Sequence, residues 1–187
     1  MCKKDEEKIP LEKLQHYEEL RFFPDLIDER YRYNFEPMEV YRTVKTNPPT
    51  DADLIPTAYM PVNDLPSIQP EITQDLVNLL ELDRKIKFLG SRSLSVDKTA
   101  DKCIREARRA IRTFSENHTL EETEAKIQER GEYVAKFTIT PEVGRITKFH
   151  KGTHAQLLLY QDVHIDDIWD SSSPVIPFKY EEDETSE

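Results

Sequence analysis

Apolar residues recur along the chain with two spacings, which predict a mixture of helices and strands. The helical spacing is clearest over 97–114, where the apolar residues share one face of a helix and the opposite face is charged. These apolar residues are Ala100, Cys103, Ile104, Ala107, Ile111 and Phe114. The alternating spacing is clearest over 133–139, where every second residue is apolar, as in a half-buried strand.

Similar patterns predict the other elements. The remaining expected helices cover 10–32, 71–83 and 119–131, and the remaining expected strands cover 39–46, 88–96 and 153–163. Thr119 and Glu122 have the spacing of a capping box, and Gly131 is expected to end that helix in the left-handed conformation. Ser95 or Asp97 is expected to cap the N-terminus of the helix over 97–114. This order of elements predicts an α+β fold with a small mixed or antiparallel sheet and packed helices.

Segments outside these elements set the domain organisation. Six prolines between 47 and 70 predict a long irregular connection, with one helical turn near Asp51. Residues 1–38 are expected to form an N-terminal helical arm, and 39–170 a single α+β domain. Residues 171–187 are expected to form a C-terminal arm that ends in an acidic tail.

Composition narrows the classes of partner. The net charge of −11 argues against a protein that coats nucleic acid or anionic membrane, and it suits a basic partner. No run of about 18 apolar residues exists, so no membrane span is expected. Cys2 lies in a charged tail and Cys103 on a helix, which favours reduced thiols and a cytoplasmic location. An ordinary N-terminus is favoured over one left by a removed signal, in which Cys2 would carry a lipid.

Alternating serines precede the helix over 97–114. Ser91, Ser93 and Ser95 would share one face of a strand, beside the free N–H groups of a helix start that attract an anion. This arrangement fits a phosphate or ribose site, and it also fits a polar strand edge in which Ser95 caps the helix. The chain has four glycines and lacks the GxSxG and glycine-rich phosphate motifs, so a serine hydrolase is not expected.

His154 lies where a loop leads into an apolar strand. An imidazole there could hydrogen-bond a ligand or transfer a proton, although a histidine bonded to the backbone is the favoured interpretation. His150 and His164 are poorly spaced to share a metal with it, and no Cys/His cluster has zinc-ligand spacing, so no metal is expected. The adjacent residues Asp166 and Asp167 are interpreted as solvated charge, because neighbours in a strand point to opposite faces.

A row of basic residues follows the outer side of the helix over 97–114. It consists of Lys98, Lys102, Arg105, Arg109 and Arg112. Such a row could dock an anionic ligand or a nucleic-acid strand. A solvated helix face is the favoured interpretation, because acidic residues interleave with the row and the protein is acidic overall. Nucleic acid is therefore not an expected partner.

The order of these segments resembles a group of uncharacterised bacterial proteins distantly related to the ADP-ribosyltransferase fold. The resemblance covers roughly residues 39–168. The stretch YRTVKTNPPTDADLIP is similar to the first strand and loop of that fold, and SRSLSVDKTADKC to its second strand and helix. GEYVAKFTIT followed by GTHAQLLLY is similar to its late strands.

This resemblance implies roles for individual residues. Arg42 would grip a dinucleotide, and Ser93 or Ser95 would face it. His154 or Gln156 would be the polar catalytic residue of the late strand. No glutamate occupies that strand, where a transferase uses one, so activity stays open.

Two functions follow as expectations. The resemblance implies a protein that binds NAD or a related nucleotide, either an ADP-ribosyltransferase-like or NAD-glycohydrolase-like enzyme or a degenerate relative. The alternative is a non-catalytic protein-binding module, such as a partner of a toxin or a component of a defence system. The negative charge and the two arms favour this alternative.

Overall fold

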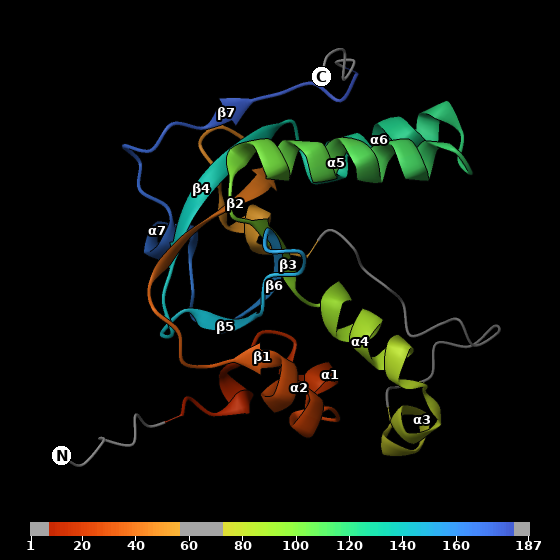
Figure 1. Ribbon diagram of the computed structural model, residues 1–187, viewed down its shortest axis with the longest axis vertical. Helices are drawn as coiled ribbons and strands as arrows, with labels where there is room; N and C mark the ends of the chain where they lie inside the picture. The colour runs from red at the N-terminus through yellow and green to blue at the C-terminus, as the bar shows by residue number, and fades with distance from the viewer. Residues whose placement is uncertain (1–7, 57–72, 182–187) are drawn as a thin grey trace.

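An antiparallel sheet forms the centre of the fold (Figure 1). The computed structural model describes residues 8–56 and 73–181, and in these ranges seven strands form one sheet in the order β1-β5-β6-β3-β2-β4-β7. The strands are β1 (Tyr31–Arg32), β2 (Met38–Val44), β3 (Leu94–Asp97), β4 (Tyr133–Ile139), β5 (Gly144–Thr147), β6 (His154–Leu159) and β7 (Ile176–Pro177). Every pairing among them is antiparallel, and helices pack around them, so the predicted α+β class is confirmed.

Helices surround the sheet. The α-helices are α1 (Tyr17–Leu20), α2 (Pro24–Arg30), α3 (Gln74–Leu79), α4 (Leu82–Ser91), α5 (Ala100–Ser115), α6 (Leu120–Arg130) and α7 (Ile165–Ile168), and η1 (Leu11–Lys13) and η2 (Asp51–Leu54) are 3₁₀ turns. The pair α5 and α6 lies along β2 and β4, whereas α1 and α2 lie at the opposite end beside β1 (Figure 1). No described helix combines the length and the apolar character that a membrane crossing requires.

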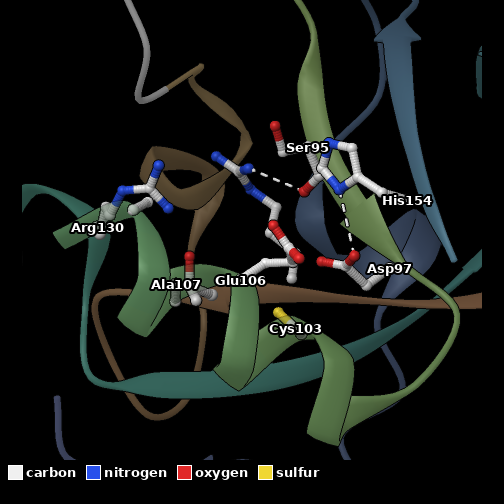
Figure 2. Close-up of a pocket in the computed structure, with 10 residues that line it drawn as sticks. Ser95, Asp97, Cys103, Glu106, Ala107, Arg130 and His154 are labelled. Carbon is white, nitrogen blue, oxygen red and sulfur yellow. Dashed lines mark hydrogen bonds and ion pairs between the residues drawn. The ribbon is translucent and has the colours of Figure 1, made fainter. Parts of the chain in front are cut away.

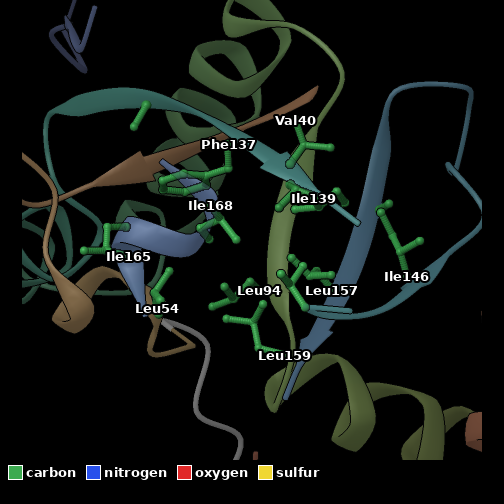
Figure 3. Packing of buried hydrophobic residues seen from close by; sticks show 14 of the residues in the cluster. Val40, Leu54, Leu94, Phe137, Ile139, Ile146, Leu157, Leu159, Ile165 and Ile168 are labelled. Atoms are coloured by element: carbon green, nitrogen blue, oxygen red, sulfur yellow. The ribbon is translucent and has the colours of Figure 1, made fainter. Parts of the chain in front are cut away.

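The main hydrophobic core lies inside the curve of the sheet (Figure 3). Strands β2 to β6 contribute to it together with η2 and α7, and its buried members include Val40, Leu54, Leu94, Phe137, Ile139, Ile146, Leu157, Leu159, Ile165 and Ile168. Successive residues of a strand point to opposite faces. Leu94 and Val96 of β3 therefore enter this core, and the residues that alternate with them face away from it. That second face of β3 and β6 carries the candidate site.

The segment expected to form an N-terminal helical arm contributes both to the sheet and to a second core. β1 pairs with β5, and Leu20 and Ile27 are buried in a cluster with residues of α4 and β6. The single helix predicted over 10–32 is wrong, because η1, α1 and α2 are short and separate. His16 has a positive φ of 59° before α1, and Pro24 begins α2, a position where its missing N–H costs no helical hydrogen bond.

The strand predicted over 88–96 is also wrong in its first half. Phe88 and Leu89 belong to α4 and pack in the second core, and β3 begins only at Leu94. A short apolar run fits a helix end as well as a strand, and packing against the N-terminal helices decides for the helix here. The expectation that Ser91, Ser93 and Ser95 share one strand face therefore fails.

Helix starts show one error and one confirmation. α5 is capped by Thr99, whose side chain accepts a hydrogen bond from the N–H of Lys102 at 3.2 Å. The predicted caps Ser95 and Asp97 are wrong, because both residues lie in β3. The capping box at the start of α6 is confirmed, with reciprocal hydrogen bonds of 2.8 and 3.2 Å between the cap and the third helical residue.

Gly131 ends α6 with φ at +89° and ψ at 166°, which is a positive-φ conformation but not the predicted left-handed helical one. A Cβ at Gly131 would overlap the backbone of Val44 in β2, so only glycine allows this approach. The predicted turn near Asp51 and the predicted strand over 133–139 are confirmed as η2 and β4.

The remaining expectations concern the chain on either side of the undescribed segment. The helix predicted over 71–83 is α3 followed by the start of α4. Residues 57–70 of the proline-rich connection, Cys2 and residues 182–187 of the acidic tail lie outside the described residues. The described part of the C-terminal arm contributes β7, which pairs with β4.

Candidate functional site

Four polar side chains occupy the face of β3 and β6 that points away from the main core. The antiparallel register places Ser95 opposite Gln156 and Asp97 opposite His154. Directly opposite residues in an antiparallel pair have Cβ atoms about 4.5–5.5 Å apart, so their side chains are neighbours. The alternation that sends apolar residues into the core therefore gathers these four groups on one surface.

These side chains form a chain of hydrogen bonds. The Ser95 hydroxyl donates to Oε1 of Gln156 at 3.4 Å, and Nε2 of Gln156 lies 3.2 Å from Nε2 of His154. Nδ1 of His154 lies 3.2 Å from Oδ1 of Asp97, as Figure 2 shows. A neutral imidazole with its proton on Nδ1 satisfies every contact, because Nδ1 then donates to the carboxylate and Nε2 accepts from the amide. The Asp97 side chain is 5% exposed and that of His154 is 32% exposed, so a buried carboxylate orients an accessible ring.

Helix α5 covers this polar face and leaves a pocket of about 190 Å³ (Figure 2). The pocket is lined by Arg42, Thr43, Ser95, Asp97, Cys103, Glu106, Ala107, Ala110, Arg130 and His154. Small residues at the helix surface allow the hollow, because Ala107 and Ala110 face it where longer side chains would fill it. The site thus combines residues from β2, β3, α5, α6 and β6.

Arg42 enters the pocket where β2 and β3 diverge. These strands share a single paired position, so few backbone hydrogen bonds join them. The Arg42 guanidinium donates from Nε to the carbonyl of Asp53 at 3.2 Å, from Nη1 to that of Ser95 at 3.2 Å and from Nη2 to that of Ile55 at 3.1 Å. Arg42 is 3% exposed, and burial lowers its pKa to about 10. The side chain therefore joins β2, η2 and β3 while its charge faces the pocket.

The pocket's thiol and hydroxyl are not arranged for nucleophilic attack. Burial, with a contribution from the charge of Asp97, raises the pKa of Cys103 to about 12, so the sulfur stays a neutral thiol. The Ser95 hydroxyl is hydrogen-bonded to an amide rather than to His154, so these residues do not form a Ser–His–Asp triad. The geometry instead suits binding and proton transfer by the imidazole.

The structure brings together most of the residues that the sequence singled out. Arg42, Ser95 and His154 line one pocket. Gln156 is hydrogen-bonded to Ser95 and to His154. Ser93 lies elsewhere and is 4% exposed. Its hydroxyl is 2.7 Å from the carbonyl oxygen of Leu89 and 3.0 Å from the hydroxyl of Tyr31, so it ties α4 to β1.

The sequence did not identify the other lining residues as part of a site, and two of these, Asp97 and Arg130, are charged groups on which the proposals below depend. Asp97 was expected only as a helix cap, although its spacing of two from Ser95 in a strand places both side chains on one face. Arg130 had no local signal, because the packing of α6 beside α5 brings it to the pocket. In the ranges 8–56 and 73–181 no group of three or more His, Cys, Asp or Glu side chains is arranged to hold a metal ion.

The fold and the pocket define the class of protein: an α+β protein with a polar pocket between an antiparallel sheet and one helix. No protein-family model matches the chain, and neither a curated protein nor a solved structure matches it. The similarity to the ADP-ribosyltransferase fold stays a prediction from the sequence.

Proposed function

We propose that the protein binds a nucleotide-class small molecule in the pocket beneath α5. The observation that carries this proposal is the Asp97–His154 pair facing the same hollow as the buried Arg42. An imidazole acceptor suits a ribose hydroxyl, and a guanidinium suits a phosphate or a carbonyl of a base.

The size of the pocket limits how much of a ligand it encloses. Pockets that bury a drug-sized ligand span about 300–1,000 Å³, whereas this one measures about 190 Å³. A nucleoside or a mononucleotide would fill it, and NAD would place one end inside with the remainder outside. NAD is therefore retained as a candidate ligand in this partly inserted form.

The same geometry supports an acid–base step as the enzyme-like form of the proposal. Asp97 holds the proton of His154 on Nδ1, which leaves Nε2 to accept a proton from a ribose hydroxyl or a water molecule once the ligand displaces the Gln156 amide. In hydrolysis of an N-glycosidic bond, water would attack the anomeric carbon, the base would leave with the bonding electrons, and His154 would take the proton of the water. This step would require neither a thiolate nor a serine nucleophile.

Calorimetric titration with nucleosides, mononucleotides and NAD tests the proposal. His154→Ala is expected to weaken binding by about tenfold or more, since a hydrogen bond worth about 1.4 kcal/mol corresponds to that factor. His118→Ala is the matched control, because His118 is exposed, lies outside the pocket and contacts Phe114 through a hydrogen bond to its carbonyl and a ring stack. Titrations in which none of these compounds binds the parent protein would reject the proposal.

A second candidate function, a protein-binding module, is favoured by one observation. Leu79 at the end of α3 and Leu82 at the start of α4 are 82% and 60% exposed, so two large apolar side chains three residues apart in the chain lie on the surface. Affinity capture from the native lysate, compared between the parent and Leu79→Asp/Leu82→Asp, tests it. A partner retained equally by both proteins would argue against this surface.

A further inference from the structure

Two arginines from different elements meet in the candidate pocket. Arg42 comes from the middle of β2, and Arg130 is the last residue of α6. The charge of Arg130 adds to burial in lowering the pKa of Arg42, so the two guanidinium groups lie close enough to repel one another. An anion that contacts both groups would remove this repulsion.

Neither arginine forms an ion pair with a carboxylate of the described residues, in contrast to the buried arginines Arg92 and Arg145. Arg92 pairs with Glu19, and Arg145 pairs with Asp28 at 2.8 Å. Arg42 donates only to carbonyl oxygens, which carry no net charge. The Asp53 carboxylate lies near Arg42, but it accepts hydrogen bonds from the backbone N–H groups of Lys45 at 2.6 Å and Thr50 at 2.9 Å. A buried cation without a direct ion pair is costly, so Arg42 beside a hollow suits an anion supplied from outside.

Both side chains retain donors for such an anion. Three of the five N–H groups of Arg42 are used by carbonyl oxygens, and the other two have no partner among the described residues. The side chain of Arg130 makes no hydrogen bond or ion pair with any described residue. A position at the C-terminus of α6 suits a basic residue through the helix dipole, but the dipole does not account for its place in the pocket wall.

We propose that Arg42 and Arg130 form a binding site for a phosphate group, which deepens and rests on the proposed nucleotide-binding function. Arg130 and His154 lie on opposite sides of the pocket (Figure 2), so the phosphate binds at the Arg130 side and the sugar lies toward His154. Phosphate oxygens match the planar fork of a guanidinium, and a dianion neutralises both charges.

The acidic residues of the pocket set the strength of this site. Asp97 is hydrogen-bonded to His154, and the one ion pair of Glu106 within residues 8–56 and 73–181 is a 3.8 Å contact with the exposed Arg109. A bound phosphate would be repelled by the Glu106 carboxylate. The site is therefore weaker in the parent protein than in a variant that lacks this charge.

Titration of the full chain with inorganic phosphate at constant ionic strength tests the inference. Arg130→Gln is expected to weaken phosphate binding about tenfold, and Glu106→Gln is expected to strengthen it about threefold. Arg105→Gln, on the exposed row of α5, is the matched control and should bind like the parent. Because the Glu106→Gln change is a gain, a misfolded variant cannot imitate it.

Two results would overturn the inference: no phosphate binding by the parent at about 10 mM, or equal binding by the parent and Arg130→Gln. A parallel titration with a nucleoside separates this inference from the proposed function. A nucleoside that binds while phosphate does not would reject the phosphate site and leave the proposed function in place. Phosphate that binds through Arg130, while nucleosides and nucleotides add no affinity, would support the phosphate site and reject the nucleotide function.

Discussion

Replacing Arg42 with methionine tests how the walls of the pocket are joined. Methionine has a long flexible side chain of comparable reach, so the substitution removes hydrogen-bond donors with little loss of packing. The carbonyl groups of Asp53, Ser95 and Ile55 would each lose the donor that Arg42 provides. Because these carbonyls belong to η2, the segment after it and β3, the substitution weakens the contact of all three with β2.

The expected decrease in the free energy of unfolding is about 3 kcal/mol. A buried acceptor left without a donor costs about 1–3 kcal/mol. The bond to Asp53 is buried and the other two are part-buried, so water replaces some of the loss and about 1 kcal/mol applies to each carbonyl. Burial lowers the pKa of Arg42 to about 10, so the surroundings oppose its charge and the net loss stays at the lower end of the range.

Urea denaturation of both proteins measures this difference, provided that the dependence of the unfolding free energy on urea is the same for each. Arg105→Met removes an exposed arginine of α5 and should change stability by less than about 0.5 kcal/mol. An Arg42→Met protein as stable as Arg105→Met would refute the structural role of Arg42 in joining β2, η2 and β3. A large loss would mean that weaker ligand binding by an Arg42 variant does not prove a direct contact, which makes Arg130 the sharper probe of the phosphate site.

Three further substitutions test the fold. Gly131→Ala should lower the free energy of unfolding by more than about 2 kcal/mol, because φ is +89° and the new Cβ would overlap the Val44 backbone; a urea midpoint close to the parent's would contradict this. Thr119→Ala should cost about 1 kcal/mol through the lost capping box, with an unchanged midpoint as the contrary result. His164→Gln tests an exposed pair in which Asp51 raises the histidine pKa above 6.5. The raised pKa stabilises the parent below pH 6.5, and this stabilisation is lost as pH rises through the folded-state pKa. The difference in unfolding free energy between the parent and His164→Gln should therefore be larger at about pH 5.5 than at about pH 8.5. A difference that grows with pH would exclude this pair as its source.

Elements specified by neighbouring residues could be predicted from the sequence. The capping box at Thr119 depends on residues within one helical turn, and the strand over 133–139 depends on a simple alternation. The turn near Asp51 follows from prolines and acidic residues in the same short stretch. These features form where the residue pattern predicts them, because each is stabilised by contacts between residues that are close in sequence.

Elements stabilised by distant partners could not be predicted in this way. β1 and β7 have two residues each, and they are strands only because β5 and β4 supply hydrogen-bond partners. Phe88 and Leu89 fit a strand by local pattern and become helical because they pack in the second core with the N-terminal helices. In both cases the deciding energy comes from packing across the fold.

The candidate site shows the same division. The sequence indicated polar residues on two strands, but the register that pairs Ser95 with Gln156 is a property of the folded sheet. Asp97 could have been found by extending the predicted strand over 88–96 by one residue, which would have placed it on the same face as Ser95. Arg130 reaches the pocket only through the turn between α5 and α6, so no pattern near it in the chain predicts its role.

Stability alone would favour a different interface between α5 and the sheet. Ala107 and Ala110 leave a hollow where larger apolar side chains would add packing energy. The hollow is instead bordered by a buried carboxylate at Asp97 and a buried guanidinium at Arg42, and each costs free energy to remove from water. Proteins tolerate such local costs where a ligand or a reaction requires them, and the remaining contacts of the fold compensate. Asp97 and Arg42 form no direct ion pair with each other. A purely structural pair would neutralise itself, whereas charges held apart across a hollow remain available to a ligand.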